Sequence, residues 1–431
     1  MTIKQFDNFK LTYENKSSNN YYHTIMKLSS NKSIAGKRGD QIRSDCYVEL
    51  EIKRSGGIKI DLKSKVESMY GDSLKAQLTE MCKFFNINHS EILLEDAGAL
   101  PFTIAARFEL AVKRLLPDLQ KEFFLPMNEK NYSSTTKDRL RRSRLYLPGN
   151  EPKFFINAGL HSPDGIILDL EDSVAHSEKD TAQLLVRNAL RSVDFYEAER
   201  MVRINQLPQG LNDLKFIVPH YVNVILIPKC ESADQVVEIE QEVHRIKRLH
   251  KIKNEVYYMP IIESALGIIK AFEIASASRH ICSLAIGLED YTADLGTQRT
   301  SEGKESFFAR SMVINAAKAA GVQAIDTVFS DVADMEGLRQ SVIEAKSLGF
   351  EGKGCIHPRQ VKVVHEAFAP TKDEIEKAKK IVLAFEEAER KGLGVVSLGT
   401  KMIDAPVVKR AERTIELAIL NKIISKNWKT E

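Results

Sequence analysis

Between residues 142 and 357 the chain carries eight short apolar runs, and nearly every run is followed by a charged residue or a histidine. Helix-length segments fill most of the gaps, so the pattern is βα repeated eight times, which predicts an α/β fold, a (β/α)8 TIM barrel. Chemistry in that fold lies at the carboxyl ends of the strands, where the charged followers belong. The chain is therefore expected to be an enzyme. The runs are Ser143–Leu147, Gly165–Leu170, Arg200–Ile204, Asn223–Ile227, Val256–Ile262, Ile281–Ile286, Ala324–Phe329 and Gly349–Ile356.

Composition limits the remaining possibilities. A barrel needs about 250 residues, and the 431 residues of this chain leave room for a second domain. The 62 basic and 59 acidic residues nearly cancel, so neither nucleic acid nor a membrane surface is an expected partner. The five cysteines have no paired or metal-ligand spacing, which favours reduced thiols in the cytoplasm. The N-terminus has no signal-like apolar core, and no run approaches the roughly 18 apolar residues of a membrane span.

The remaining segments predict a five-part organisation. A polar, mobile N-terminal tail (1–32) precedes a small α+β domain (33–118) with a ββαβα pattern. Its first two strands, Asp45–Lys53 and Ile58–Leu62, flank Ser55-Gly56-Gly57 and predict a hairpin. A charged linker (119–141) leads to the barrel (142–370), and a C-terminal helical extension (371–431) follows.

Two acidic residues follow neighbouring barrel strands. Glu263 ends the fifth run and Asp290 follows the sixth, so their carboxylates can face one point. Two carboxylates with several waters are the usual protein ligands of Mg2+. The alternative is a pair of solvated or helix-capping carboxylates, and Asp290 in particular could cap the next helix.

Basic residues at the strands have alternative interpretations too. Arg203 lies among apolar residues and needs an anion, either the carboxylate of a bound acid or a buried Asp169. Lys229 could form an imine, or an ion pair with Glu171 or Glu231. The group Arg142, Arg144, Lys353 and Arg359 belongs to the first and eighth strands, where barrels often bind phosphate, although a solvated rim explains it equally well. His357, before Pro358, is a candidate base or a loop-fixing residue.

A series of motifs, in order, resembles the citrate lyase beta-chain (HpcH/HpaI aldolase/citrate lyase) family of CoA-thioester lyases over roughly residues 139 to 425. The motifs are Arg142-Ser143-Arg144-Leu145-Tyr146-Leu147-Pro148-Gly149-Asn150, Leu168-Asp169-Leu170-Glu171-Asp172, Val202-Arg203-Ile204-Asn205, Ile227-Pro228-Lys229, Ile262-Glu263-Ser264-Ala265-Leu266-Gly267, Gly287-Leu288-Glu289-Asp290-Tyr291, Phe308-Ala309-Arg310, Asp326-Thr327-Val328-Phe329-Ser330-Asp331, His357-Pro358-Arg359-Gln360 and Gly399-Thr400-Lys401-Met402-Ile403-Asp404-Ala405-Pro406.

The resemblance implies an activity and roles for individual residues. It implies Mg2+-dependent cleavage of a citryl-, citramalyl- or malyl-CoA thioester into acetyl-CoA and a 2-oxo acid. Glu263 and Asp290 match the Mg2+ ligands, Arg203 the substrate-binding arginine, and Asp404 the acid/base aspartate that serves a neighbouring subunit. A homo-oligomer, a trimer or a hexamer, is therefore implied. Substrate- or CoA-binding roles are expected of Arg142, Arg144, Glu171, Asp172, Lys229 and Lys353.

The region from Ala35 to about Leu115 resembles the citrate lyase acyl carrier protein, or gamma chain. That family attaches its prosthetic arm to a serine just before the first strand, and Arg43 stands at this position here. Ser44 could take the arm instead, or be an ordinary hydroxyl at a strand edge. Three hypotheses follow: a free-standing lyase, a subunit that acts on a carrier-bound citryl thioester, and a non-catalytic scaffold. Because the catalytic residue types are all present, the scaffold is disfavoured.

Overall fold

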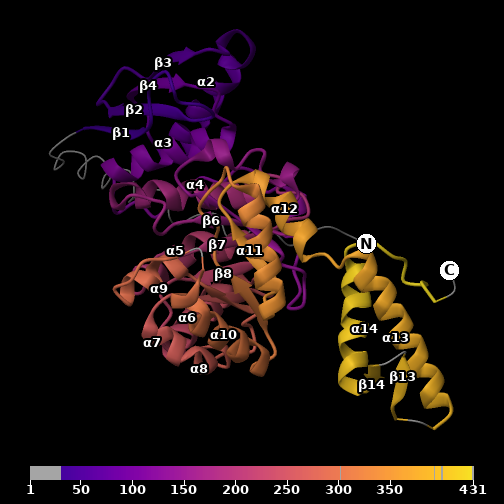
Figure 1. Cartoon of the computed structure of the whole chain (residues 1–431). Helices are drawn as coiled ribbons and strands as arrows, with labels where there is room; N and C mark the ends of the chain where they lie inside the picture. The colour runs from indigo at the N-terminus through magenta and orange to yellow at the C-terminus, as the bar shows by residue number, and fades with distance from the viewer. Residues whose placement is uncertain (1–30, 301, 393, 399–400, 430–431) are drawn as a thin grey trace, which may run out of the picture.

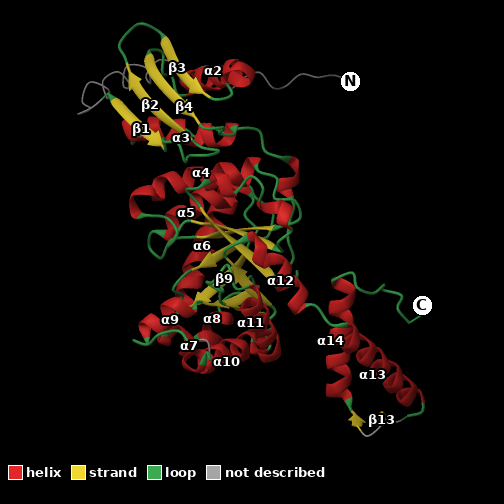
Figure 2. Ribbon diagram, turned by 45° about the horizontal axis from the view of Figure 1, so that its top comes forward, coloured by secondary structure: helices red, strands yellow, loops and turns green. Residues whose placement is uncertain are grey.

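The computed structural model describes residues 31–300, 302–392, 394–398 and 401–429. A small α+β unit lies on one side of a central barrel, and a pair of long helices projects from another side (Figure 1; Figure 2). Most of the predicted tail lies outside the described residues, but Lys32 already begins a strand.

Eight parallel strands close into a barrel in chain order, as the eight apolar runs predicted. The first and last strands pair directly, with Gly354 opposite Arg144, which completes the closure. The TIM-barrel prediction is therefore confirmed. The strands are β5 (Ser143–Pro148), β6 (Gly165–Asp169), β7 (Glu199–Arg203), β8 (Val224–Ile227), β9 (Tyr257–Ile262), β10 (Ser283–Ile286), β11 (Gln323–Asp326) and β12 (Gly352–Cys355).

Side chains that alternate along each strand form two cores. Inward-facing residues such as Met201, Leu226, Met259 and Ile325 fill the barrel interior, and outward-facing ones pack under the surrounding helices. The interior is thus packed, and a ligand must bind at the rim. The helices around it are α4 (Lys179–Ser192), α5 (Gly210–Ile217), α6 (Ala233–His250), α7 (Ala265–Ile269), α8 (Ala271–Ala275), α9 (Leu288–Asp294), α10 (Lys304–Ala319), α11 (Met335–Leu348) and α12 (Pro358–Phe368).

The N-terminal sheet corrects the predicted hairpin. Its strand order is β1-β2-β4-β3, so β4 lies between the two strands that were expected to pair. The fully alternating β2 and the central β4 bury one face, whereas β3 exposes Lys59, Asp61 and Lys63 and suits an edge. The sequence analysis also missed β1, which pairs antiparallel with β2. The elements are β1 (Lys32–Gly36), β2 (Cys46–Ile52), β3 (Ile58–Ser64), α2 (Glu67–Phe84), β4 (Ser90–Asp96) and α3 (Pro101–Leu115).

Helix α3 joins the small unit to the barrel. It lies between the N-terminal sheet and barrel helix α4 (Figure 1), and most of its side chains are buried. At the contact with α4, Arg187 donates from Nη1 and Nη2 to Glu109 at 2.9 and 2.8 Å, and both side chains are fully buried. Arg187 also pairs with Glu122, at 2.9 Å. The small unit is therefore fixed to the barrel by a buried charge network.

Residues between the small unit and the barrel pack against the amino ends of the barrel strands. Buried Arg141 donates to the Glu199 carboxylate at the start of β7, with both bonds 2.8 Å long. Thr135 donates to the same carboxylate. A charge at this depth requires such pairing, so this connection belongs to the barrel's structure.

The C-terminal extension forms a helical arm. Helices α13 (Lys372–Arg390) and α14 (Ala405–Leu420) pack along each other, and β13 (Val396–Leu398) pairs with β14 (Lys401–Ile403) at their far end (Figure 2). Ile381, Phe385, Ile415 and other residues give the arm its own hydrophobic core. Thr371 caps α13 through a capping box with Glu374. Among the helices of the described residues, none is both long and apolar enough to cross a membrane.

Candidate active site

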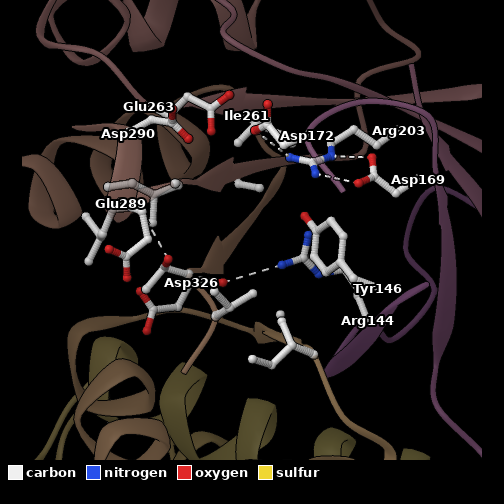
Figure 3. Close-up of a pocket in the computed structure, with 18 of the residues that line it drawn as sticks. Arg144, Tyr146, Asp169, Asp172, Arg203, Ile261, Glu263, Glu289, Asp290 and Asp326 are labelled. Atoms are coloured by element: carbon white, nitrogen blue, oxygen red, sulfur yellow. Dashed lines mark hydrogen bonds and ion pairs between the residues drawn. The ribbon is translucent and has the colours of Figure 1, made fainter. Parts of the chain in front are cut away.

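A cavity of about 310 Å³ opens where the barrel strands end, as the fold predicts. Figure 3 shows Glu263 and Asp290 on one side of it, with Arg203 and Asp169 on the other. Other lining residues include Arg144, Tyr146, Asp172, Glu289, Asp326 and Thr327.

Arg203 is held in place by acidic residues of the β6 end. Its Nε and Nη2 donate to the two oxygens of Asp169, each at 2.6 Å, and Nη1 lies 2.9 Å from Glu171. Of the two anions considered for Arg203, the structure shows the buried aspartate. Burial raises the pKa of the Asp169 carboxyl, but Arg203 outweighs it and holds this pKa below its usual range. The guanidinium therefore stays charged and fixed at the cavity wall.

Glu263 is buried with little compensation. It is 5% exposed and accepts one hydrogen bond, 2.6 Å long, from the Lys229 backbone N–H. Burial, together with the nearby charges of Asp290 and Glu171, raises the pKa of its carboxyl to about 8. A Cβ at Gly287 would lie 2.4 Å from the Glu263 Oε2, so glycine is needed there to leave room for the carboxylate. A cation at this position would stabilise the ionised form of the Glu263 carboxyl.

Asp290 lies in the first turn of α9 and lines the same cavity. Gly287, and not Asp290, occupies the N-cap position of that helix, so the capping alternative does not describe its role. Its carboxylate pairs only loosely with Lys229, whose Nζ lies 3.3 Å away. Two carboxylates with open space between strand ends are a donor set that suits a hard divalent cation such as Mg2+.

The raised pKa of Glu263 predicts how stability depends on pH. In the presence of a chelator, the free energy of unfolding should fall as pH rises from about 5 to about 8, because the folded protein holds a proton that the unfolded chain has lost. Each pKa unit corresponds to about 1.4 kcal/mol, so a loss of a few kcal/mol is expected.

Urea denaturation at several pH values measures this slope, and Glu263→Gln should flatten it. An equal slope in the variant would show that another group titrates.

Lys229 follows β8, and the acidic residues Glu171 and Asp172 follow β6, at the cavity end of the barrel. Burial lowers the pKa of Lys229, but Asp290 and Asp172 outweigh this and raise it. A lysine that forms imines needs the opposite shift, so the geometry favours an ion-pair role. The Glu171 carboxylate contacts Arg203 and accepts a hydrogen bond from Gln206, so its oxygens are held by protein groups. Asp172 is half exposed and lines the cavity.

Two of the expected phosphate-binding cations are buried, one in the cavity floor and one beside a separate hollow. Arg144 is buried, its Nη2 lies 3.4 Å from the Asp326 carbonyl oxygen, and its Nε finds no hydrogen-bond partner among the described residues. It lines the cavity floor. Lys353 is fully buried and pairs with the Asp326 carboxylate at 2.6 Å, facing a separate hollow between α10 and α11. Its charge is thus already balanced by the protein.

The prediction for Arg142 is wrong. This residue precedes β5, so it lies at the amino end of the strand, opposite the cavity. There it pairs with Asp164 at 2.8 Å and contacts Asn421 of the arm. His357 has the loop-fixing role that was considered for it, because its side chain accepts the Arg359 backbone N–H at the start of α12.

Asp404 and Ser44 also lie outside the cavity formed by this chain. Asp404 sits at the far end of the arm, where its side chain caps α14 by accepting the Val407 backbone N–H at 3.2 Å. Ser44 precedes β2 in a left-handed conformation (φ 56°), beside the buried ion pair of Asp45 and Arg107. Part of the Asp404 motif, residues 399 and 400, lies outside the described residues.

Tyr146, Glu289 and Asp326 are among the lining residues that were not chosen from the sequence as site residues. Tyr146 lies two positions after Arg144 on β5 and so faces the same way, with the Arg203 guanidinium 5.4 Å from its ring centre. That period-two spacing could have identified it. Glu289 pairs with Arg299, and Asp326 gathers Lys353 and Arg310. Lys353 and Arg310 belong to other elements than Asp326, so only the tertiary structure reveals their ion pairs with it.

Known proteins share both parts of this architecture. Residues 142–358 match the family model described as HpcH/HpaI aldolase/citrate lyase, and residues 35–115 match the ACP model described as malonate decarboxylase delta subunit (MdcD). The chain is 42% identical to citrate lyase subunit beta of Leuconostoc mesenteroides subsp. cremoris, over 67% of this chain and 96% of that protein. It is 31% identical to mitochondrial citramalyl-CoA lyase of Mus musculus, over 70% of this chain and 94% of that one.

A solved structure supports the same assignment. The protein CitE of Mycobacterium tuberculosis, in complex with magnesium, acetoacetate and coenzyme A, is 30% identical with a TM-score of 0.54, and the match covers 66% of this chain and 99% of that one. The family predicted from the ordered motifs is confirmed. The chain belongs to the HpcH/HpaI aldolase/citrate lyase family, and an acyl-carrier-like domain precedes its barrel.

Proposed function

We propose that this protein is a Mg2+-dependent carbon–carbon lyase that cleaves a 3-hydroxyacyl-CoA thioester into acetyl-CoA and a 2-oxo acid. The observation that carries the proposal is the pair Glu263 and Asp290 facing Arg203 across a cavity at the strand ends (Figure 3). The relatives named citrate lyase subunit beta and citramalyl-CoA lyase support the reaction class.

Glu263 and Asp290 would hold the metal ion. The CitE structure contains magnesium, and the carboxylate donors here suit that ion. When bound, Mg2+ supplies Lewis-acid stabilisation of the oxygen that becomes the keto group. Ionisation of Glu263, whose pKa is raised to about 8, accompanies binding and makes it pH-dependent.

The chain's own residues would orient the acid and move the proton. Arg203 is fixed by Asp169 and would bind a carboxylate or oxyanion of the acid fragment. As the C–C bond breaks, the hydroxyl proton would pass to solvent water, which later returns a proton to Asp404, and the bonding electrons would pass to the thioester as an enolate. Asp404 would protonate the enolate carbon to give the acetyl group.

An acid at the far end of the arm suits a role in another copy of the chain. Besides Asp404, this end carries Val395 and Met402, which are 47% and 67% exposed. Exposed apolar residues beside a polar functional group are typical of a contact surface. We propose that the arm inserts Asp404 into a neighbouring subunit's cavity, within a homo-oligomer that is a trimer or a hexamer.

Mixed oligomers test this arrangement. Asp404→Asn and Asp290→Asn should each be inactive alone, because each lacks one half of a shared site. Co-expression with two different affinity tags should restore activity, since some sites then combine an intact cavity with an intact arm. Mixed oligomers that form but remain inactive would show that Asp404 does not complete the cavity of a neighbouring subunit.

The substrate is tested directly. Purified protein with Mg2+ is incubated separately with citryl-, citramalyl- and malyl-CoA, and release of acyl-CoA and keto acid is followed. Turnover of one free CoA ester would establish an autonomous lyase and name its substrate. If none is cleaved, the autonomous function fails.

A second candidate is a subunit that acts on a carrier-bound citryl thioester. The carrier-like domain favours it, because Lys37, in the loop before Ser44, pairs with Glu151 just after β5, at the cavity end of the barrel. Arg43 argues against it. Intact mass of the protein, with Ser44→Ala as control, would detect an attached arm.

We also propose that the chain divides into the units 33–118, 142–370 and 371–431, with 119–141 as the linker between the first two. A cytoplasmic location is proposed as well. The separate cores of the barrel and the arm support the division. All five cysteines, each in the described part of the chain, are buried free thiols, which supports a reducing compartment.

A further inference from the structure

A cluster of metal-ligand side chains lies away from the candidate active site. Glu240 and His244 are one turn apart on α6, and both face His280 in the segment before β10. One donor atom from each of the three lies within 4.8 Å of the others. His280 precedes β10 by three residues, so the cluster is at the amino end of the strands, opposite the cavity.

Hydrogen bonds fix the side chains of Glu240 and His280 in this cluster. His280 is 9% exposed, and its Nδ1 lies 2.7 Å from Glu240 Oε1. Ser278 donates from Oγ to the same Glu240 oxygen at 2.5 Å and accepts the His280 backbone N–H at 3.0 Å. The positions of Glu240 and His280 are therefore defined by neighbours other than each other.

The remaining nitrogen of His280 has its own partner. Its Nε2 lies 3.3 Å from Glu255, a residue that also lies 3.9 Å from the Lys247 ammonium. A carboxylate that accepts from one imidazole nitrogen orients the ring, so that the other nitrogen can bind a metal ion. Nδ1 is thus directed to the space shared by Glu240 and His244.

We propose that Glu240, His244 and His280 form a binding site for a transition-metal dication of the Zn2+ class, with water completing the coordination. Imidazole nitrogens and one carboxylate oxygen are ligands that Zn2+ accepts readily, whereas Mg2+ prefers oxygen donors. Around Zn2+ with bonds of about 2.0–2.2 Å, tetrahedral ligand atoms are roughly 3.4 Å apart. Side-chain movements of about 1 Å would therefore bring the three donor atoms from within 4.8 Å of one another to the spacing that Zn2+ requires.

The bound ion would connect parts of the barrel that are distant in sequence. Glu240 and His244 belong to α6, His280 leads into β10, and Glu255, its partner, leads into β9. Because the unfolded chain does not hold these ligands together, binding stabilises the folded state. The site's role is structural, and it takes no part in the lyase reaction.

Calorimetric titration of the full-length protein with ZnCl2, in excess Mg2+, tests the proposal. His244→Gln removes an exposed ligand without disturbing the core, and His250→Gln removes an exposed histidine from the end of the same helix as a matched control. Wild type and the His250 variant should bind one tight Zn2+ per chain. His244→Gln should bind at least about tenfold more weakly.

Thermal unfolding provides a second readout. Zn2+ should raise Tm in wild type and in the His250 variant, and raise it much less in His244→Gln. Absence of tight binding by wild type, or equal binding by both variants, would overturn the proposal. Lyase activity is measured separately and does not enter either readout.

Discussion

Replacing Asp290 with asparagine should lower kcat/KM of the proposed lyase reaction by at least about 10²-fold. The substitution removes one of the two carboxylates that face the cavity and leaves Glu263 as the sole negatively charged ligand of the pair. The remaining site would bind Mg2+ poorly and place it loosely. Initial rates measured over a range of Mg2+ concentrations, with the substrate identified as above, give the effect.

Asp294→Asn is the matched control for this variant. It removes the same charge from the same helix, but Asp294 is exposed and accepts the Ala265 backbone N–H at 2.7 Å outside the cavity. Its activity should stay close to wild type. Because Asp290 is partly exposed and its one ion pair within the described residues is with Lys229, its variant should also keep the wild-type Tm. Equal losses in the two variants would contradict the assigned role.

Replacing Glu109 with alanine should lower the free energy of unfolding by about 3–5 kcal/mol. The variant leaves Arg187 fully buried, with the Glu122 carboxylate, the neighbouring Asn188 and the Phe124 ring as its remaining partners among the described residues. It also removes the acceptor of the Phe123 backbone N–H. Urea denaturation followed by circular dichroism measures the loss, which should appear in the transition that separates the small unit from the barrel.

Two further variants separate burial from charge. Glu109→Leu combined with Arg187→Met replaces the ion pair by apolar side chains and should recover most of the lost stability. Asp180→Asn breaks the exposed pair with Arg114, 3.0 Å apart at the same interface, and should cost less than about 1 kcal/mol. A loss in Glu109→Ala no larger than in Asp180→Asn would contradict the interface role.

This interface could not be predicted from the sequence. Glu109 lies on α3 and Arg187 on α4, and in the sequence each resembles an ordinary charge on a helix surface. Their pairing depends on how two separate units meet. The same is true of β4, whose insertion between β2 and β3 replaced the expected hairpin, because sheet order is a choice between distant partners.

The local sequence was informative for features that span a single strand or helix. Apolar runs of strand length, separated by helical segments, determined the barrel and placed Arg203, Glu263 and Asp290 at strand ends. Arg142 was misplaced because a charge just before a strand and one just after it lie at opposite faces of the barrel, and a short motif does not mark where its strand begins.

The sequence by itself therefore determined the fold class, the family and the main cavity residues, since these follow from periodicity and from residue types at strand ends. Only the tertiary structure decided which charges are already paired. It joined Arg203 to Asp169, Lys353 to Asp326, and Glu240 to His280. The physical reason is that electrostatic partners are set by distance in space and by burial, and neither quantity is local in the chain.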